Sequence, residues 1–362
     1  MTPRVAWLAL VLALPMACAR DEYSFEVETE HVRIARTFDA PLCAGTIRAI
    51  DRDAARIAEQ LDAEELAPMD VVLGIEAVLD HCPEGSAGCA QPGQRVWSDI
   101  GSVGHELVHA FAGEAPSGYQ AFFDEGLAEA LGGGTLDFHR LEVEIQEVSI
   151  LDMVMTADLG SEGYRVAGHF VAWLIDRWGV SVFLDFRESL TDTTTLAAID
   201  EIFQGFYGIS LADADSMWRS TAPSNYTLGE NGCSGWSEPW IDETRWSGSV
   251  MVDCDDVDTQ GPLGWGTAVE AGMVRSVLVD VLTPGHYRIS VSATRSGIVE
   301  LDSVACGCWT SEHGRERFEV GEDPRTYEAD LQACRYEVSF VVSGVEAGSV
   351  DVELELVEAD PW

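Results

Sequence analysis

The feature of this sequence that most constrains its fold is a change in hydrophobic periodicity near residue 220. Before it, apolar residues recur at spacings of three and four, for example between residues 47 and 61, which is typical of helices that bury one face. After it, apolar and polar residues alternate, as in 277–281 and 350–356, which is typical of strands. The pattern predicts an α+β protein: a mostly helical domain with a small N-terminal sheet over residues 22–220, a linker over 221–232, and a disulfide-containing, β-sandwich-like domain over 233–362.

Residues 1–18 have the pattern of a signal peptide. Arg4 precedes a short apolar run, and small residues precede Cys18. Residues 14–18 also resemble a bacterial lipoprotein signal, in which the cysteine becomes the lipidated first residue. We therefore expect an exported protein, either a cell-envelope lipoprotein (periplasmic or at the outer membrane or surface) or a freely secreted one. Contact with a membrane is expected only through a lipid anchor at Cys18.

The cysteines and the charge fit an exported protein. Nine cysteines leave eight without Cys18, an even number suited to disulfides in an oxidising compartment. The predicted bridges in the first domain are Cys82–Cys89, or Cys43 with one of that pair. The second domain holds five cysteines, so one of them is a candidate to pair across the domains. A formal net charge of −42 argues against nucleic acid as a partner, and we expect a monomer.

Upstream of residue 100 the periodicity predicts alternating strands and a helix. We expect one strand over 23–37, a helix over 43–61, a buried strand over 70–75 and a compact loop around Cys82 and Cys89. Arg95–Ser98 is predicted as a short edge strand, which could align an extended peptide by backbone pairing. An ordinary strand is an equally good interpretation of those four residues.

The segment His105-Glu106-Leu107-Val108-His109 carries the clearest chemistry. Ser102 and Gly113 mark the expected ends of its helix, and histidines four residues apart lie on the same face of a helix and can bind one metal ion. Glu106, beside the first histidine, is then placed to act as a general base, as in the HExxH motif of zinc peptidases. The alternative interpretation is a helix with two incidental histidines.

A second helix, expected over residues 119–131, supplies a carboxylate that would complete the site. The sequence Asp124-Glu125-Gly126-Leu127-Ala128 after HExxH resembles the gluzincin zinc metallopeptidases, in particular the aminopeptidase-N-like branch. The resemblance implies a zincin-like domain, Zn²⁺ as the cofactor, and Glu125 as the third ligand beside His105 and His109. Glu129, one turn later, competes for that role but fits better as an acceptor for the free nitrogen of a zinc histidine.

The helix expected over 163–179 is similar to a third segment of that family, and the resemblance spans roughly residues 100 to 220. In the family, the tyrosine that opens this helix donates a hydrogen bond to the oxyanion of the tetrahedral intermediate, and that role passes to Tyr164. His169, on the same helix, is interpreted as a histidine satisfied in the core, with a second electrophile as the alternative.

These observations predict a zinc-dependent peptidase that hydrolyses peptides or proteins, with Glu106 and Tyr164 as catalytic residues. The exopeptidase branch of the family reads a free N-terminus with a Gly-x-Met-Glu-Asn segment, which residues 74–78 match poorly. Endopeptidase action is therefore preferred over aminopeptidase action. The alternative hypothesis is a catalytically inactive, metallopeptidase-like binding or scaffold lipoprotein, although such a protein would not need Glu106. A closed structural zinc site would need a fourth ligand.

Overall fold

The structure is a computed structural model. It describes residues 23–63, 68–113, 121–132, 149–156, 159–190, 195–222, 237–238, 240–242, 244–263, 272–303, 315–344 and 346–359. The predicted signal peptide with Cys18 and nearly all of the predicted linker lie outside these ranges.

A mixed sheet of five strands organises the first part of the chain, in the order β1-β2-β3-β5-β4. β2, β3 and β5 are parallel, and β1 and β4 run antiparallel to their neighbours. The strands are β1 (Val27–Glu28), β2 (Val32–Arg36), β3 (Met69–Leu73), β4 (Gly88–Gln91) and β5 (Arg95–Ser98).

Both faces of this sheet are covered. On one face α1 (Ala44–Gln60) and α3 (Val103–Ala112) share a core with apolar residues of β3 and β5. On the other face, α2 (Ile75–His81) contributes Ala77 to a small cluster with Trp97. Coverage on both sides explains why every residue of β3 is buried. Asp70 is tolerated there because Arg33 and Arg95, in register with it on either side, both pair with its carboxylate.

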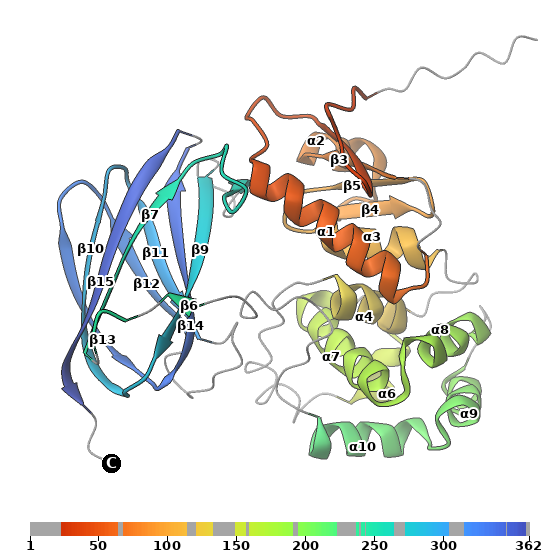
Figure 1. The fold of residues 1–362 in the computed structure, drawn as a ribbon. Helices are drawn as coiled ribbons and strands as arrows, with labels where there is room; N and C mark the ends of the chain where they lie inside the picture. Colours follow the sequence, from red (N-terminus) through yellow and green to blue (C-terminus); the bar gives the residue numbers. More distant parts are fainter. Residues whose placement is uncertain are drawn as a thin grey trace, which may run out of the picture.

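A layer of helices completes the first unit (Figure 1). Aromatic side chains of four of these helices pack against one another at its centre, mostly edge to face. The helices are α4 (Ala121–Leu131), α6 (Ile150–Val154), α7 (Gly160–Trp178), α8 (Val180–Ser189), α9 (Leu196–Tyr207) and α10 (Leu211–Thr221).

The second unit consists of two sheets whose inner faces share one apolar core. The four-stranded sheet has the order β13-β10-β15-β7, and the six-stranded sheet has the order β12-β11-β14-β9-β6 with β8 paired to β9. The strands are β6 (Ser237–Glu238), β7 (Arg245–Val252), β8 (Gln260–Leu263), β9 (Gly272–Val281), β10 (Gly285–Ala293), β11 (Gly297–Asp302), β12 (Arg315–Val320), β13 (Arg325–Leu331), β14 (Cys334–Ser343) and β15 (Gly348–Ala359).

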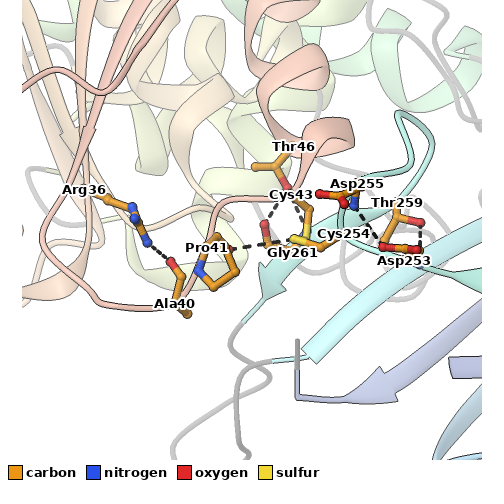
Figure 2. The surroundings of a disulfide bond; sticks show 10 residues. All are labelled: Arg36, Ala40, Pro41, Cys43, Thr46, Asp253, Cys254, Asp255, Thr259 and Gly261. Atoms are coloured by element: carbon orange, nitrogen blue, oxygen red, sulfur yellow. Dashed lines mark hydrogen bonds between the residues drawn. A yellow bond between two sulfur atoms is a disulfide. The ribbon is translucent and has the colours of Figure 1, made fainter. Parts of the chain in front are cut away.

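The two units are joined at the N-terminus of α1, where Cys43 forms a disulfide with Cys254 (Figure 2). The first amides of a helix have no partner within it. Here the second unit supplies partners: Ala44 donates to the Cys254 carbonyl, and Cys43 donates to the Gly261 carbonyl. The Thr46 hydroxyl donates to the same Gly261 carbonyl and accepts from the Gly261 amide. The second unit therefore caps α1.

The disulfides decide between the predicted pairings. Cys82–Cys89 is confirmed, and so is a bridge between the two parts of the chain, because Cys43 pairs with Cys254. The alternative in which Cys43 pairs with Cys82 or Cys89 is wrong. The other second-domain cysteines except Cys334 lie outside the described residues.

The predicted fold class is wrong. We expected a mostly helical, zincin-like metallopeptidase domain with a small sheet, followed by a β-sandwich-like domain, whereas the described residues are about 38% helix and 35% strand in three sheets. The sheet of the first unit was underestimated because two of its strands, β1 and β4, have only two and four residues. Runs that short carry no readable periodicity.

Three predictions about single strands and loops of the first unit are also corrected. The strand expected over 23–37 is a hairpin, β1 and β2, because a turn at residues 29–31 reverses the chain. The loop expected around Cys82 and Cys89 contains β4. The strand Arg95–Ser98 is present as β5, but it is not an edge strand, since β4 pairs with its outer side. Among the described residues no helix is long and apolar enough to cross a membrane.

Candidate metal centre

Two antiparallel helices bring the predicted ligands together. α3 runs from Val103 to Ala112, as its N-terminal serine and C-terminal glycine predict, and α4 begins at Ala121. Nε2 of His105 lies 3.2 Å from Nε2 of His109. Oε2 of Glu125 lies 3.0 Å from the first of these nitrogens and 3.3 Å from the second.

These spacings fit a tetrahedral zinc ion. Ligand atoms at bond lengths of about 2.0–2.1 Å from zinc in tetrahedral directions lie about 3.3 Å from one another. Two imidazole nitrogens and one carboxylate oxygen are also the donor set of a catalytic zinc that keeps one position open. Within the described ranges, His105, His109 and Glu125 are the one group of three metal-ligating side chains whose donor atoms converge.

Glu129 lies behind the first histidine. Its Oε1 is 3.0 Å from Nδ1 of His105, the nitrogen that faces away from Glu125. A carboxylate at this place orients the ring and leaves Nε2 free for a metal. Oε2 of Glu125 therefore lies beside the Nε2 atoms of both histidines, and Glu129 lies on the other side of the His105 ring.

Glu106 is buried beside the two histidines, with 7% of its surface exposed. Its side chain packs on the edge strand β4 at Gly88, where a Cβ would lie 2.7 Å from Cγ of Glu106. Only a residue without a side chain allows this approach. Gly88 was not singled out from the sequence, because nothing in a glycine inside an expected loop indicates which distant side chain it contacts.

The histidine and glutamate side chains of the site shift one another's pKa values. Burial alone would lower the pKa of His105, but hydrogen bonds to Glu125 and Glu129 and the charge of Glu106 raise it to about 10. Burial alone would raise the pKa of Glu125, but hydrogen bonds from both histidines lower it to about 2. For Glu106 burial prevails over the nearby histidines and raises its pKa. A cation bound here would replace a proton, so its apparent affinity should increase with pH.

Tyr164 belongs to α7 and lies near the first histidine. The centroid of its ring is 6.1 Å from that of His105. α7 can come this close because it packs tightly on α4 at Gly126, where a Cβ would meet Val171 at 2.6 Å. The glycine that follows Glu125 thus has a physical role: it lets α4 approach the helix that carries Tyr164.

His169, also on α7, takes no part in the site. Its Nδ1 accepts a hydrogen bond of 2.7 Å from Nε1 of Trp218, and both residues are almost fully buried. The interpretation of His169 as a satisfied core histidine is confirmed.

Comparisons with known proteins give no identity. No family model and no curated protein matches the sequence. A solved structure described as "BiXyn10A CBM1 APO" has a TM-score of 0.19 and 13% identity, covering 33% of this chain and 87% of its own. A second structure, described as "CBM4 structure and function", has a TM-score of 0.17 and 13% identity. The match covers 29% of this chain and 70% of that structure's chain. A family 29 carbohydrate-binding module has a TM-score of 0.15 and 13% identity, covering 30% and 92%. At TM-scores this low, these likenesses support no statement about this chain.

Proposed function

We propose that this protein is an exported zinc-dependent peptidase that hydrolyses bonds within peptides or proteins. The observation that carries the proposal is the tetrahedral spacing of the donor atoms of His105, His109 and Glu125, with the buried carboxyl group of Glu106 beside them. A metal-binding helix without catalytic function would have no need of that carboxyl group.

In this proposal the three ligands hold Zn²⁺, which would supply a Lewis acid and lower the pKa of a bound water towards neutrality. Glu106 accepts the proton of the attacking water and later passes it to the nitrogen of the leaving amine. The burial of Glu106 beside the two histidines supports both roles. Tyr164 donates a hydrogen bond from its hydroxyl to the developing oxyanion, a contact typically worth about 3 kcal/mol.

We also propose that β4 aligns the substrate. It is the last strand of its sheet and packs against Glu106, and an edge strand can pair with an extended peptide through its backbone. This assigns to β4 the role that the sequence suggested for Arg95–Ser98. A substrate aligned along a strand favours cleavage within a chain, which is the reason to prefer an endopeptidase.

The proposed location is outside the cytoplasm, either in the cell envelope through a lipid at Cys18 or as a secreted monomer. The disulfides Cys43–Cys254 and Cys82–Cys89 support an oxidising compartment. The net charge of −42 argues against nucleic acid as a partner.

The test is the substitution Glu106→Gln, which keeps the size of the side chain and removes its basicity. We expect zinc binding within a few-fold of the wild type and turnover of a peptide library reduced by about 10²–10⁴-fold. Mass spectrometry of the cleavage products, with and without a chelator, measures this and separates internal cuts from removal of N-terminal residues. Glu201→Gln, an exposed glutamate on α9, is the matched control. Wild-type cleavage rates in Glu106→Gln would rule the mechanism out.

The rival hypothesis, an inactive metal-binding scaffold, makes a different prediction for the same experiment. It expects one zinc ion per chain and no cleavage of any peptide in the library by the wild-type protein.

A further inference from the structure

Arg187 of α8 is a buried cation that the sequence did not single out. Only 5% of its surface is exposed. A buried guanidinium needs several acceptors to offset its desolvation, and Arg187 finds three of them. Its Nε donates to Oδ1 of Asp124, Nη1 to the carbonyl of Ala112 at 3.1 Å, and Nη2 to the carbonyl of Gly113 at 2.9 Å.

These acceptors lie at the C-terminus of α3 and near the N-terminus of α4, the helix ends nearer to His109 and Glu125. Ala112 and Gly113 end α3, three and four residues after His109, and the last carbonyls of a helix lack partners within it. Asp124 directly precedes Glu125 in the first turn of α4. One side chain from a third helix therefore joins the end of the histidine helix to the start of the glutamate helix.

The opposite end of the same helix pair is fixed by a different device. At the start of α3, a Cβ on Gly104 would lie 2.1 Å from the carbonyl oxygen of Gly132, which follows α4. The backbones there are in direct contact. α3 and α4 are thus antiparallel helices held by backbone packing at one end and by a guanidinium group at the other.

We propose that Arg187 is a positioning residue for the metal ligands: its contacts with Ala112, Gly113 and Asp124 hold α3 and α4 so that Glu125 meets His105 and His109. The proposal rests on the proposed zinc site, but it concerns the relation of two helices and has consequences without a metal. Lysine cannot replace this residue, because its ammonium is a single point and cannot reach acceptors on both helices as the planar fork does.

The first test is zinc affinity, measured by competition with a chromophoric chelator. We expect Arg187→Met to bind zinc about 10–100-fold more weakly than the wild type, the usual effect of losing a group that orients a ligand. Arg187→Lys should fall nearly as far, whereas a role limited to neutralising Asp124 would be rescued by lysine. Arg177→Met, an exposed arginine on α7, is the matched control and should bind zinc normally. Wild-type zinc affinity in both Arg187 variants would overturn the proposal.

The second test covers two complications. If Arg187→Met fails to fold, Arg187→Met combined with Asp124→Leu replaces the charged pair by an apolar one, and such replacements commonly preserve folding. That double variant should fold and still bind zinc more weakly, and wild-type affinity in it would again overturn the proposal.

If the wild-type protein binds no zinc, the proposed function fails, and hydrogen exchange of the metal-free proteins decides. Faster exchange in Ala121–Glu125 of Arg187→Met supports the positioning role, and unchanged exchange overturns it.

Discussion

His105 in the first unit and His286 in the second have similar neighbours and different surroundings. Both nitrogens of each ring face a carboxylate: Glu125 and Glu129 for His105, and Asp330 and Glu328 for His286. The side chain of His105 is 18% exposed and that of His286 is 39% exposed.

The difference lies in how the backbone supplies the neighbours. His286 lies opposite Asp330 in the ladder of β10 and β13, and side chains on neighbouring strands stand side by side and point to solvent. On α3 a second histidine follows one turn later, and α4 adds its carboxylate from across the helix interface. In this protein, the histidine between two acids on the sheet is a surface ion pair, whereas the one on α3 is a candidate metal ligand because His109 and Glu125 add further donors.

The largest expected effect comes from removing each histidine in turn. His105→Ala should weaken zinc binding by more than about 100-fold, because even the groups that merely orient metal ligands contribute about 10–100-fold. His286→Ala should leave zinc affinity unchanged. Competition with a chromophoric chelator measures both. Equal losses in the two variants would mean that burial and the second histidine do not define the site.

The sequence indicated which side chains of the candidate site lie close together better than it indicated the fold, for a physical reason. His105, Glu106 and His109 lie on one helix, and Glu125 and Glu129 lie one turn apart on another, so helical spacing alone indicates which of them share a face. The contacts that fix the helices are of a different kind. Arg187 reaches backbone carbonyls 74 and 75 residues away, and carbonyls have no signature in a sequence.

The sheet of the first unit was missed for a similar reason. β4 has four residues and contains Cys89, which is only seven residues from its disulfide partner Cys82, and so short a separation is equally compatible with a loop. Which strand lies at an edge depends on pairing, not on its own residues, so Arg95–Ser98 could be recognised as a strand but not placed in the interior of the sheet.

An intermediate effect is expected from the packing that makes the helix site different from the sheet surface. Gly126→Ala places a methyl group 2.6 Å from Val171 and 2.8 Å from the carbonyl oxygen of Ala167, and overpacking of this kind costs about 1–3 kcal/mol. Gly205→Ala, within α9, meets nothing within 4 Å and should instead stabilise the protein by about 1 kcal/mol. Denaturant unfolding of the metal-free proteins measures both. A neutral Gly126→Ala would mean that α4 and α7 are not packed as closely as described.

The smallest effect concerns the exposed histidine and its dependence on pH. The hydrogen bond to Asp330, opposed by some desolvation and aided by Glu328, raises the pKa of His286 in the folded protein. A group whose pKa is raised on folding contributes stability that is fully present below its unfolded value, about 6.5 for histidine, and that is lost as pH rises through the folded value. His286→Gln should therefore lower the melting temperature slightly at about pH 5.5, and the difference should disappear at high pH.

Salt sharpens this last contrast. An exposed ion pair is screened at about 1 M salt, where the Debye length is about 3 Å, so the difference between the wild type and His286→Gln at acidic pH should shrink there. Buried charges are screened much less, so the zinc affinity that separates His105→Ala from the wild type should depend little on added salt. Thermal unfolding at low and high salt measures the first effect, and chelator competition under the same conditions measures the second. A salt-insensitive difference for His286→Gln would show that this histidine acts by packing. His105 and His286 would then share only the presence of two neighbouring carboxylates.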